Sequence, residues 1–274
     1  MGGATGCAGR RGKDVAARRS RPYYAIGGGP RVQSDGAAPA RRARLRVHAA
    51  EPRPSSRALA LMSRGFPVPP FADECLHAAS GAWGASFEHP FVRQLAEGTL
   101  APARFRFYQM QDARYLEAFA DAASLISTRC PDPDDKLWFV DAARMALVVE
   151  RSLHAGYGET LGYTAADVAR VALTPSNRAY QDHMIGTAVR GTLVEAIAAL
   201  TPCPWLYIAL GQHLERTHGA PPDSHPYADW LRMYADPGFN DYMREILARL
   251  QRAADAADDA ARADRKSTRL NSSH

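Results

Sequence analysis

Cysteine is scarce in this chain, and the only four are Cys7, Cys75, Cys130 and Cys203. No two of them form a CxxC pair or a regular spacing, so neither a disulfide framework nor a zinc ribbon is indicated. The sequence also lacks a signal-peptide pattern and a run of about twenty apolar residues. We therefore expect a cytoplasmic protein that does not span a membrane.

Alternation of polar and apolar residues, the pattern of a half-buried strand, is lacking as well. Between residues 69 and 262 the apolar positions recur at helical spacing, and Pro or Gly marks most of the breaks. The predicted helices cover 70–86, 88–97, 101–129, 133–160, 165–171, 176–200, 202–219, 225–236 and 238–262. The short connections favour antiparallel packing, so the expected fold is an all-α bundle that forms a single domain.

Positive charge is concentrated at the N-terminus. The whole chain has a formal net charge of +5, but residues 1–61 carry thirteen Lys and Arg against three acidic residues, a net of +10. The remaining residues therefore sum to −5. A mildly acidic body does not favour nucleic acid as a partner.

Both ends of the chain differ in composition from the patterned region. Residues 1–61 are rich in Arg, Ala, Gly and Pro without an apolar period, and we interpret them as a disordered or non-native leader. An organellar transit peptide is the alternative, but no amphipathic helical pattern supports it. Residues 266–274 break abruptly from the Ala-, Asp- and Arg-rich segment before them, and we interpret them as an artefactual tail. The domain is then expected at 62–265.

The segment 201–207, Thr-Pro-Cys-Pro-Trp-Leu-Tyr, is typical of a helix start. Thr201 is expected to be the N-cap, with a hydroxyl that accepts a hydrogen bond from a backbone N–H, and Pro202 suits the first helical position. Cys203 would then lie among unpaired N–H groups at the positive end of the helix dipole, which favours the thiolate. A catalytic cysteine is one interpretation. The other is a structural cysteine that behaves as a small hydrophobic residue.

A second helix carries a carboxylate within an apolar face. Positions 105, 108, 112, 115, 119, 122 and 126 share this face and read Phe, Tyr, Asp, Tyr, Phe, Ala and Ile. Burying the charge of Asp112 without a partner would be costly. Asp112 therefore either has an internal partner or lines a pocket that receives a polar ligand.

Other tyrosines lie at helical spacing in apolar segments. Tyr180 follows a Thr-Pro-Ser helix start at 174–176, and Tyr234 lies four residues after Trp230. Aromatic residues at this spacing more often form plain core than a ligand box.

Two Glu and His pairs raise the possibility of a metal site. Glu150 with His154, and Glu215 with His218, could each place a carboxylate and an imidazole on one helical face, as di-iron bundles do. Matches of this kind are unspecific, and we predict no metal site.

Three blocks at consistent distances carry a resemblance to a known family. Residues 110–116 match its Leu-Gln-Asp-x-x-Tyr-Leu block, 175–184 its Pro-Ser-x-x-x-Tyr-x-x-His-Met block, and 201–207 its Leu-Pro-Cys-x-Trp-Leu-Tyr block. With 86–92 and 98–100, they span most of the region from about 70 to 250. The chain resembles the TenA family, thiaminase II or aminopyrimidine aminohydrolase, of the haem-oxygenase-like fold, in its cysteine-bearing branch.

The resemblance implies a function and a site. Cys203 would attack the ring carbon of a 4-aminopyrimidine, and Asp112 would hold the amino group and a ring nitrogen. The reaction implied is hydrolysis of thiamin, or of 4-amino-5-aminomethyl-2-methylpyrimidine, to the hydroxymethyl pyrimidine in thiamin salvage. No cofactor is implied, and family members are usually homotetramers. The residues implied to stack on or hydrogen-bond the ring and the thiol are Tyr115, Tyr180, Tyr207 and Tyr234.

One block of the family has no counterpart in this sequence. It reads Tyr-Glu-x-x-Phe-Trp on the last helix, and its glutamate serves as the acid/base for the leaving group. The chain reaches Arg265 about where that helix is expected, so we interpret the domain as C-terminally truncated, with its last helix missing. Two other functions stay open: a haem-oxygenase-like di-iron oxidase, and a pyrimidine-binding relative without catalysis.

Overall fold

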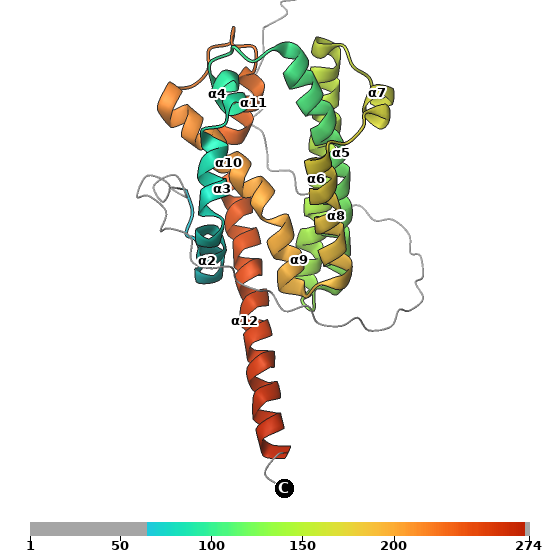
Figure 1. Ribbon diagram of the computed structural model, residues 1–274, viewed down its shortest axis with the longest axis vertical. Helices are drawn as coiled ribbons and strands as arrows, with labels where there is room; N and C mark the ends of the chain where they lie inside the picture. The colour runs from blue at the N-terminus through green and yellow to red at the C-terminus, as the bar shows by residue number, and fades with distance from the viewer. Residues whose placement is uncertain (1–64, 272–274) are drawn as a thin grey trace, which may run out of the picture. The chain divides into compact units, whose positions relative to one another are not determined.

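The computed structural model describes residues 65–271, except for the side chains of 149–151, 153–155 and 260–271. This part of the chain is helical without a strand, as predicted (Figure 1). The proposed leader at 1–61 and residues 272–274 lie outside the described residues. The helices are α2 (Pro70–Ala78), α3 (Ser80–Phe87), α4 (Pro90–Ala96), α5 (Pro102–Arg129), α6 (Pro133–Leu161), α7 (Ala165–Arg170), α8 (Pro175–Arg190), α9 (Leu193–Leu200), α10 (Pro202–His218), α11 (Ala228–Ala235) and α12 (Phe239–Asn271).

Proline and short polar caps start most of these helices. Helices α2, α4, α5, α6, α8 and α10 all begin with proline, whose missing N–H would have no intrahelical acceptor at that position. Thr174 caps α8 as predicted, because its hydroxyl accepts a hydrogen bond from the Asn177 backbone N–H at 3.3 Å.

Three predicted helix boundaries are wrong. The helix expected over 176–200 is divided at Gly191 and Thr192, where Thr192 and Glu195 form a reciprocal capping box that starts α9. The helix expected over 70–86 is divided at Ala79. Helix α12 continues to Asn271, past the predicted end at 262 and into the segment interpreted as a tail.

The main core lies where α5, α6, α8, α9, α10 and α12 meet. Helix α5 packs along α6 and α8, and α12 packs against α9 and α2. Fully buried side chains at this junction include Ile126, Met184, Leu200 and Leu247, and burial of each contributes about 1.5–3 kcal/mol. A second core around Phe105 joins the start of α5 to α4 and α11. The candidate site lies between these two cores.

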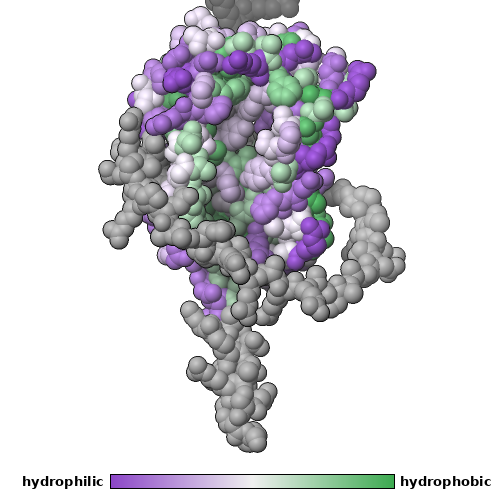
Figure 2. Space-filling view, viewed as in Figure 1, coloured by the Kyte–Doolittle hydropathy of each residue, from purple (hydrophilic) through white to green (hydrophobic). Residues whose placement is uncertain are grey.

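The surface is hollowed between α10 and the neighbouring helices α5 and α8 (Figure 2). Pale and green atoms, from weakly polar and apolar residues, form much of the floor of this hollow, whereas strongly polar residues gather on its rims. A concave, mostly apolar surface with few polar groups is typical of a small-molecule site.

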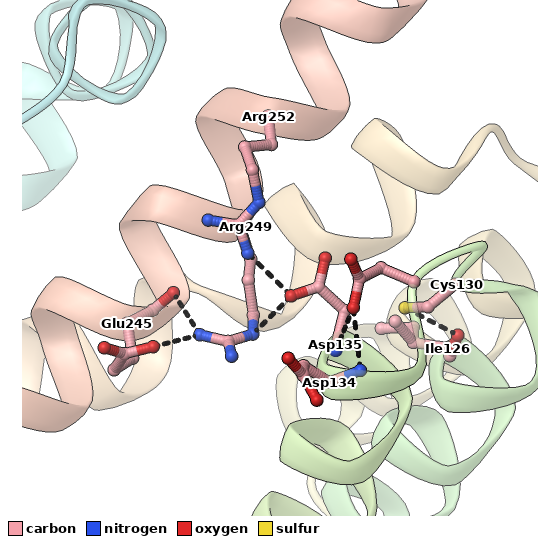
Figure 3. Close-up of polar contacts among 8 residues, drawn as sticks. Ile126, Cys130, Asp134, Asp135, Glu245, Arg249 and Arg252 are labelled. Atoms are coloured by element: carbon pink, nitrogen blue, oxygen red, sulfur yellow. Dashed lines mark hydrogen bonds and ion pairs between the residues drawn. The ribbon is translucent and has the colours of Figure 1, made fainter.

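A buried arginine attaches α12 to the start of α6 (Figure 3). Arg249 is 8% exposed; its Nε lies 3.0 Å from an Asp135 carboxylate oxygen, and its Nη1 pairs with Glu245. The guanidinium carbon lies 4.6 Å from the centre of the Trp138 ring. Arg252, which is more exposed, also reaches Asp135, at 2.6 Å. This cluster fixes α12 against the bundle in addition to its apolar face.

By length and composition, the run Leu193–His218 formed by α9 and α10 could cross a membrane. Half of its most apolar window is buried inside the protein, however, and Leu200, Trp205 and Ile208 belong to the main core. Buried core helices commonly pass the same test, so this run is weak evidence for a membrane span.

Candidate active site

Four helices bring the sequence-predicted site residues together. Helix α5 supplies a carboxylate and a tyrosine, α10 supplies the cysteine and a tyrosine, and α8 and α11 supply one tyrosine each. Direct contacts or electrostatic interactions connect all of them, as detailed below. The residues are Asp112, Tyr115, Tyr180, Cys203, Tyr207 and Tyr234.

The backbone at the start of α10 differs from the prediction. Thr201 has helical dihedral angles, φ −63° and ψ −38°, and its hydroxyl donates to the Ile197 carbonyl at 2.7 Å instead of capping α10. Helix α9 therefore passes almost directly into α10, and the hydroxyl turns back to the preceding turn, as it commonly does within a helix. Because the negative end of α9 meets the positive end of α10, the dipole effect expected at Cys203 is offset.

The thiol of Cys203 is protonated in the resting site. The residue is partly exposed, but burial of the thiol group raises its pKa from 9.0 to about 12, and the charge of Asp112 adds to this increase. A hydrogen bond with the Tyr115 hydroxyl acts in the opposite direction and lowers the pKa. The prediction of a stabilised thiolate is therefore wrong for the resting site, because desolvation outweighs the favourable groups.

Asp112 is 8% exposed and forms no ion pair among the described residues. Its Oδ1 accepts a hydrogen bond from the Tyr207 hydroxyl at 3.5 Å. Burial raises the pKa of Asp112 from 3.8 to about 7, although the Tyr207 hydrogen bond lowers it in part. Of the two alternatives considered from the sequence, the structure shows an internal partner, the Tyr207 hydroxyl, and Asp112 itself does not line the neighbouring cleft. Near neutral pH the group can either donate or accept a proton.

Two aromatic pairs flank the thiol and the carboxylate. Near the thiol, the rings of Tyr115 and Tyr180 are stacked, with centroids 5.5 Å apart and planes at 29°. Near the carboxylate, the Tyr207 and Tyr234 ring centroids are 4.9 Å apart. Tyr180 also donates to the Ala199 carbonyl at 3.3 Å. Aromatic walls around one carboxylate and one thiol suit a flat, polar ring.

Two further residues, Tyr108 and Trp230, are connected to the carboxylate through Tyr207, and the sequence analysis assigned no role to them. The Trp230 indole N–H donates to the Tyr108 hydroxyl at 3.2 Å, and Tyr108 donates to the Tyr207 hydroxyl at 3.1 Å. A signal for Tyr108 was present, since it lies one turn before Asp112 on the same helical face. Trp230 gave no such signal, because its link to Tyr108 is between residues 122 positions apart.

A buried glutamine fixes α8 to α5 beside the site. The Gln111 amide N–H donates to the Ala172 carbonyl at 2.9 Å. Its side-chain oxygen accepts from the Thr174 backbone N–H and from Asn177 Nδ2, both at 3.0 Å. This network sets the position of the start of α8, and therefore of Tyr180, relative to Asp112.

A cleft of ≈ 870 Å³ opens next to the carboxylate side of the site. Tyr108, Tyr207 and Trp230 form part of its lining, together with residues of α3, α4 and the start of α8. The hydrogen-bonded aromatic residues therefore separate Asp112 from an open, largely apolar volume.

Of the two Glu and His pairs considered from the sequence, the structure describes the side chains of only one. Glu215 and His218 lie exposed at the end of α10. The side chains of Glu150 and His154 lie outside the described residues. Within the described part of the chain, no three His, Cys, Asp or Glu side chains form a group that could hold a metal ion.

Comparison with known proteins gives consistent matches. A protein of Halalkalibacterium halodurans named aminopyrimidine aminohydrolase is 31% identical over 185 residues, which are 67% of this chain and 82% of that protein. A Bacillus subtilis protein with the same name is 31% identical over 205 residues, covering 74% of this chain and 85% of that protein. The solved structure of a TenA homologue from P. horikoshii superimposes with a TM-score of 0.60 at 29% identity, covering 65% of this chain and 83% of that one. The all-α, haem-oxygenase-like fold predicted from the sequence is confirmed. Residues 76–273 match the TENA/THI-4/PQQC family, and the chain belongs to this family.

Proposed function

We propose that this protein hydrolyses thiamin, aminomethyl pyrimidine, or both, to hydroxymethyl pyrimidine in thiamin salvage, by covalent catalysis through Cys203. The observation that carries the proposal is the convergence of Cys203 and Asp112 between two tyrosine pairs, close enough for the charge of Asp112 to act on the thiol. The names of the relatives in H. halodurans and B. subtilis support the same chemistry.

The site suits recognition of an aminopyrimidine ring. A ring nitrogen next to an amino group offers one acceptor and one donor, and a carboxyl that holds a proton near neutral pH offers the complementary pair. Asp112 meets this requirement because its pKa is about 7. Tyr115, Tyr180, Tyr207 and Tyr234 supply the aromatic surfaces on either side.

The covalent step must remove the thiol proton as the sulfur attacks. We assign the bond formed to Cys203 Sγ and a ring carbon. Asp112 gives its proton to the ring nitrogen and takes up the thiol proton, so that the thiol proton is in effect transferred to the ring. The bond from the exocyclic methylene carbon to the leaving nitrogen then breaks, and water adds to that carbon. The sulfur–carbon bond finally breaks and the proton returns to sulfur, so that the net reaction consumes one water and releases ammonia from aminomethyl pyrimidine or the thiazole from thiamin.

With aminomethyl pyrimidine as substrate, the leaving amino group also needs a proton. In the family resemblance a glutamate in a Tyr-Glu-x-x-Phe-Trp block provides it, and this sequence contains no such block. Loss of a general acid typically slows a reaction by about two to four orders of magnitude. We therefore expect slow turnover by this chain, and faster turnover when a helix bearing that block is joined to its C-terminus.

Product analysis tests the proposal. Thiamin and aminomethyl pyrimidine are incubated with the chain and with its extended form, hydroxymethyl pyrimidine is measured by mass spectrometry, and intact protein mass reports a covalent adduct. Cys203→Ala should abolish product and adduct, whereas Cys75→Ala, at an exposed cysteine away from the site, should keep both. Equal rates for the extended protein and its Cys203→Ala variant would show that the nucleophile is wrongly assigned. Binding of the pyrimidine without turnover in either form would favour a non-catalytic relative.

We also propose that the protein forms a homotetramer and is located in the cytoplasm. The exposed apolar residues Leu137 and Val140 on α6, 63% and 50% exposed, are consistent with a face used in assembly. Sedimentation velocity measures the assembly directly, and a monomer at micromolar concentration would contradict it.

A further inference from the structure

Three hydrogen bonds join α11 to the carboxylate through two tyrosines. They run from Trp230 to Tyr108, from Tyr108 to Tyr207, and from Tyr207 to Asp112 Oδ1, with donor–acceptor distances of 3.2, 3.1 and 3.5 Å. Trp230 is buried, and the burial of Tyr108 and Tyr207 raises the pKa of each well above its usual value of 10. The three hydrogen bonds thus lie among largely desolvated groups, although Tyr108 and Tyr207 are partly exposed where they line the cleft.

The donor of the first hydrogen bond, Trp230, sets the direction of all three hydrogen bonds. An indole N–H can only donate, so the Tyr108 oxygen accepts from Trp230 and has its own proton free for Tyr207. The Tyr207 oxygen accepts a hydrogen bond from the Tyr108 hydroxyl, and the Tyr207 hydroxyl in turn donates to Asp112 Oδ1. Hydrogen bonds in such a series polarise one another, so each donor strengthens the next.

We propose that Tyr108 and Trp230 are positioning residues that act through Tyr207 to hold Asp112 Oδ1 as an acceptor, so that the carboxyl proton is carried on Oδ2. Among the described residues, no hydrogen bond reaches Oδ2. Oδ2 is therefore the oxygen left to donate to a ligand, while Oδ1 keeps one lone pair to accept from it.

This arrangement has a consequence for specificity, which rests on the proposed function. A fixed donor beside a fixed acceptor matches a ring nitrogen next to an amino group. A 4-oxo ring held in the same orientation presents a ring N–H and a carbonyl, which is the reverse pattern. The hydrogen-bond relay formed by Trp230, Tyr108 and Tyr207 would therefore help the site to distinguish 4-aminopyrimidines from their 4-oxo counterparts.

The titratable groups that face Asp112 are neutral when the site is at rest. They are Tyr108 on its own helix, Cys203 and Tyr207 on α10, and Tyr234 on α11. Burial raises the pKa of each of these four groups, so Asp112 is the group that titrates near pH 7. A change in the relay should therefore be visible in the titration of this one carboxyl.

The test is a titration of the substrate-free protein labelled with ¹³C at aspartate carboxyl carbons, where Asp112 is assigned by the signal lost in Asp112→Asn. Tyr108→Phe and Trp230→Phe should each raise the pKa of Asp112 by roughly half a unit to one unit, because the hydrogen bond to the carboxylate is weakened. The matched control is Tyr227→Phe, which removes a buried phenol hydrogen bond to the Leu100 carbonyl outside the relay. It should leave the titration unchanged.

A double-mutant cycle separates positioning from general loosening. In a Tyr207→Phe background, Tyr108→Phe should produce no further shift, since the link to Asp112 is already lost. Additive shifts, no shift in either single variant, or an equal shift in the Tyr227→Phe control would overturn the inference. Circular dichroism confirms that each variant is folded, and Trp230→Phe provides a second reading if Tyr108→Phe is not.

Binding measurements then test specificity apart from turnover. The ratio of the dissociation constants of 4-oxo and 4-amino hydroxymethyl pyrimidine should fall by about three- to tenfold in Tyr108→Phe. If the ratio of dissociation constants is unchanged while the pKa of Asp112 shifts, the relay has no role in specificity. Failure of the proposed function alone would appear as missing turnover while the titration still shifts in the relay variants.

Discussion

Asp112→Asn should stabilise this protein at alkaline pH, although it removes a residue proposed to bind substrate. The side chain is 8% exposed, no cation pairs with it among the described residues, and its pKa is raised from 3.8 to about 7. A buried carboxylate of this kind opposes folding when it is ionised. Such cost is expected where a site is built for function and not for stability.

The sign follows from the two pKa values. Since the folded pKa lies above the unfolded value, the native state binds the proton more tightly than the unfolded chain does. The contribution of Asp112 to the free energy of unfolding therefore falls as the pH rises from about 4 and levels off above about 7. Over this interval the total loss is about 4 kcal/mol, at about 1.4 kcal/mol per pKa unit.

Urea unfolding followed by circular dichroism between pH 4 and pH 8 measures this effect. The difference in unfolding free energy between Asp112→Asn and the unchanged protein should increase by about 4 kcal/mol in favour of the variant across this range. The asparagine amide is left with an unpaired N–H, which costs about 1–3 kcal/mol at every pH and cancels in the comparison across pH. The control is Asp121→Asn, which makes the same substitution at an exposed position of the same helix.

Two results would refute this reasoning. If the difference between Asp112→Asn and the unchanged protein stays flat from pH 4 to pH 8, Asp112 does not carry the assigned desolvation. If the difference changes in the opposite direction, the carboxylate has a stabilising partner in the native state.

Two further substitutions test the packing that holds the site. In Gly211→Ala the new Cβ would lie 2.3 Å from the Tyr234 carbonyl carbon, so α11 must move; we expect a loss of about 2 kcal/mol in thermal unfolding and weaker pyrimidine binding. Gly84→Ala, with open space around its Cβ, should instead gain up to about 1 kcal/mol, and similar losses in both would contradict this account. Arg249→Ala should cost about 2–3 kcal/mol in urea unfolding, because it breaks a buried pair. Arg252→Ala, which removes a more exposed pair to the same carboxylate, should cost less than about 1 kcal/mol, and the reverse order would show that the buried pair is not the stabilising one.

The helical pattern was predictable because it depends on local spacing, whereas the tyrosines of the candidate site were predicted only through the family resemblance. The face that includes Asp112 and Tyr115 follows from the 3.6-residue period, and it is buried as expected. The division at Gly191 and Thr192 was less visible, since an apolar helical period continues across it. A capping box with Glu195 decided that boundary, and the same motif could have been identified in the sequence.

Properties that depend on several helices could not be predicted in this way. The sequence places Cys203 at a helix start, but the direction of its pKa shift is set by burial together with Asp112 and Tyr115 from another helix. The role of Thr201 likewise depends on the way in which α9 runs into α10. The hydrogen bond between Tyr108 and Trp230 joins distant parts of the sequence, so no local pattern reports it.

The resting state of the thiol changes how the site must operate. With the pKa of Cys203 at about 12 and that of Asp112 at about 7, transfer of the thiol proton to the carboxylate is strongly unfavourable before substrate binds. In the proposed mechanism, attack by Cys203 would therefore be favourable only if the ring receives a proton as sulfur forms its bond. This requirement would couple activation of the thiol to binding of an aminopyrimidine at Asp112. A ligand that cannot accept a proton from Asp112 would leave the thiol neutral. Under the proposed function, the specificity of the site would therefore reside in the Asp112 carboxyl and its hydrogen-bond relay, and Cys203 would become a nucleophile only after that recognition.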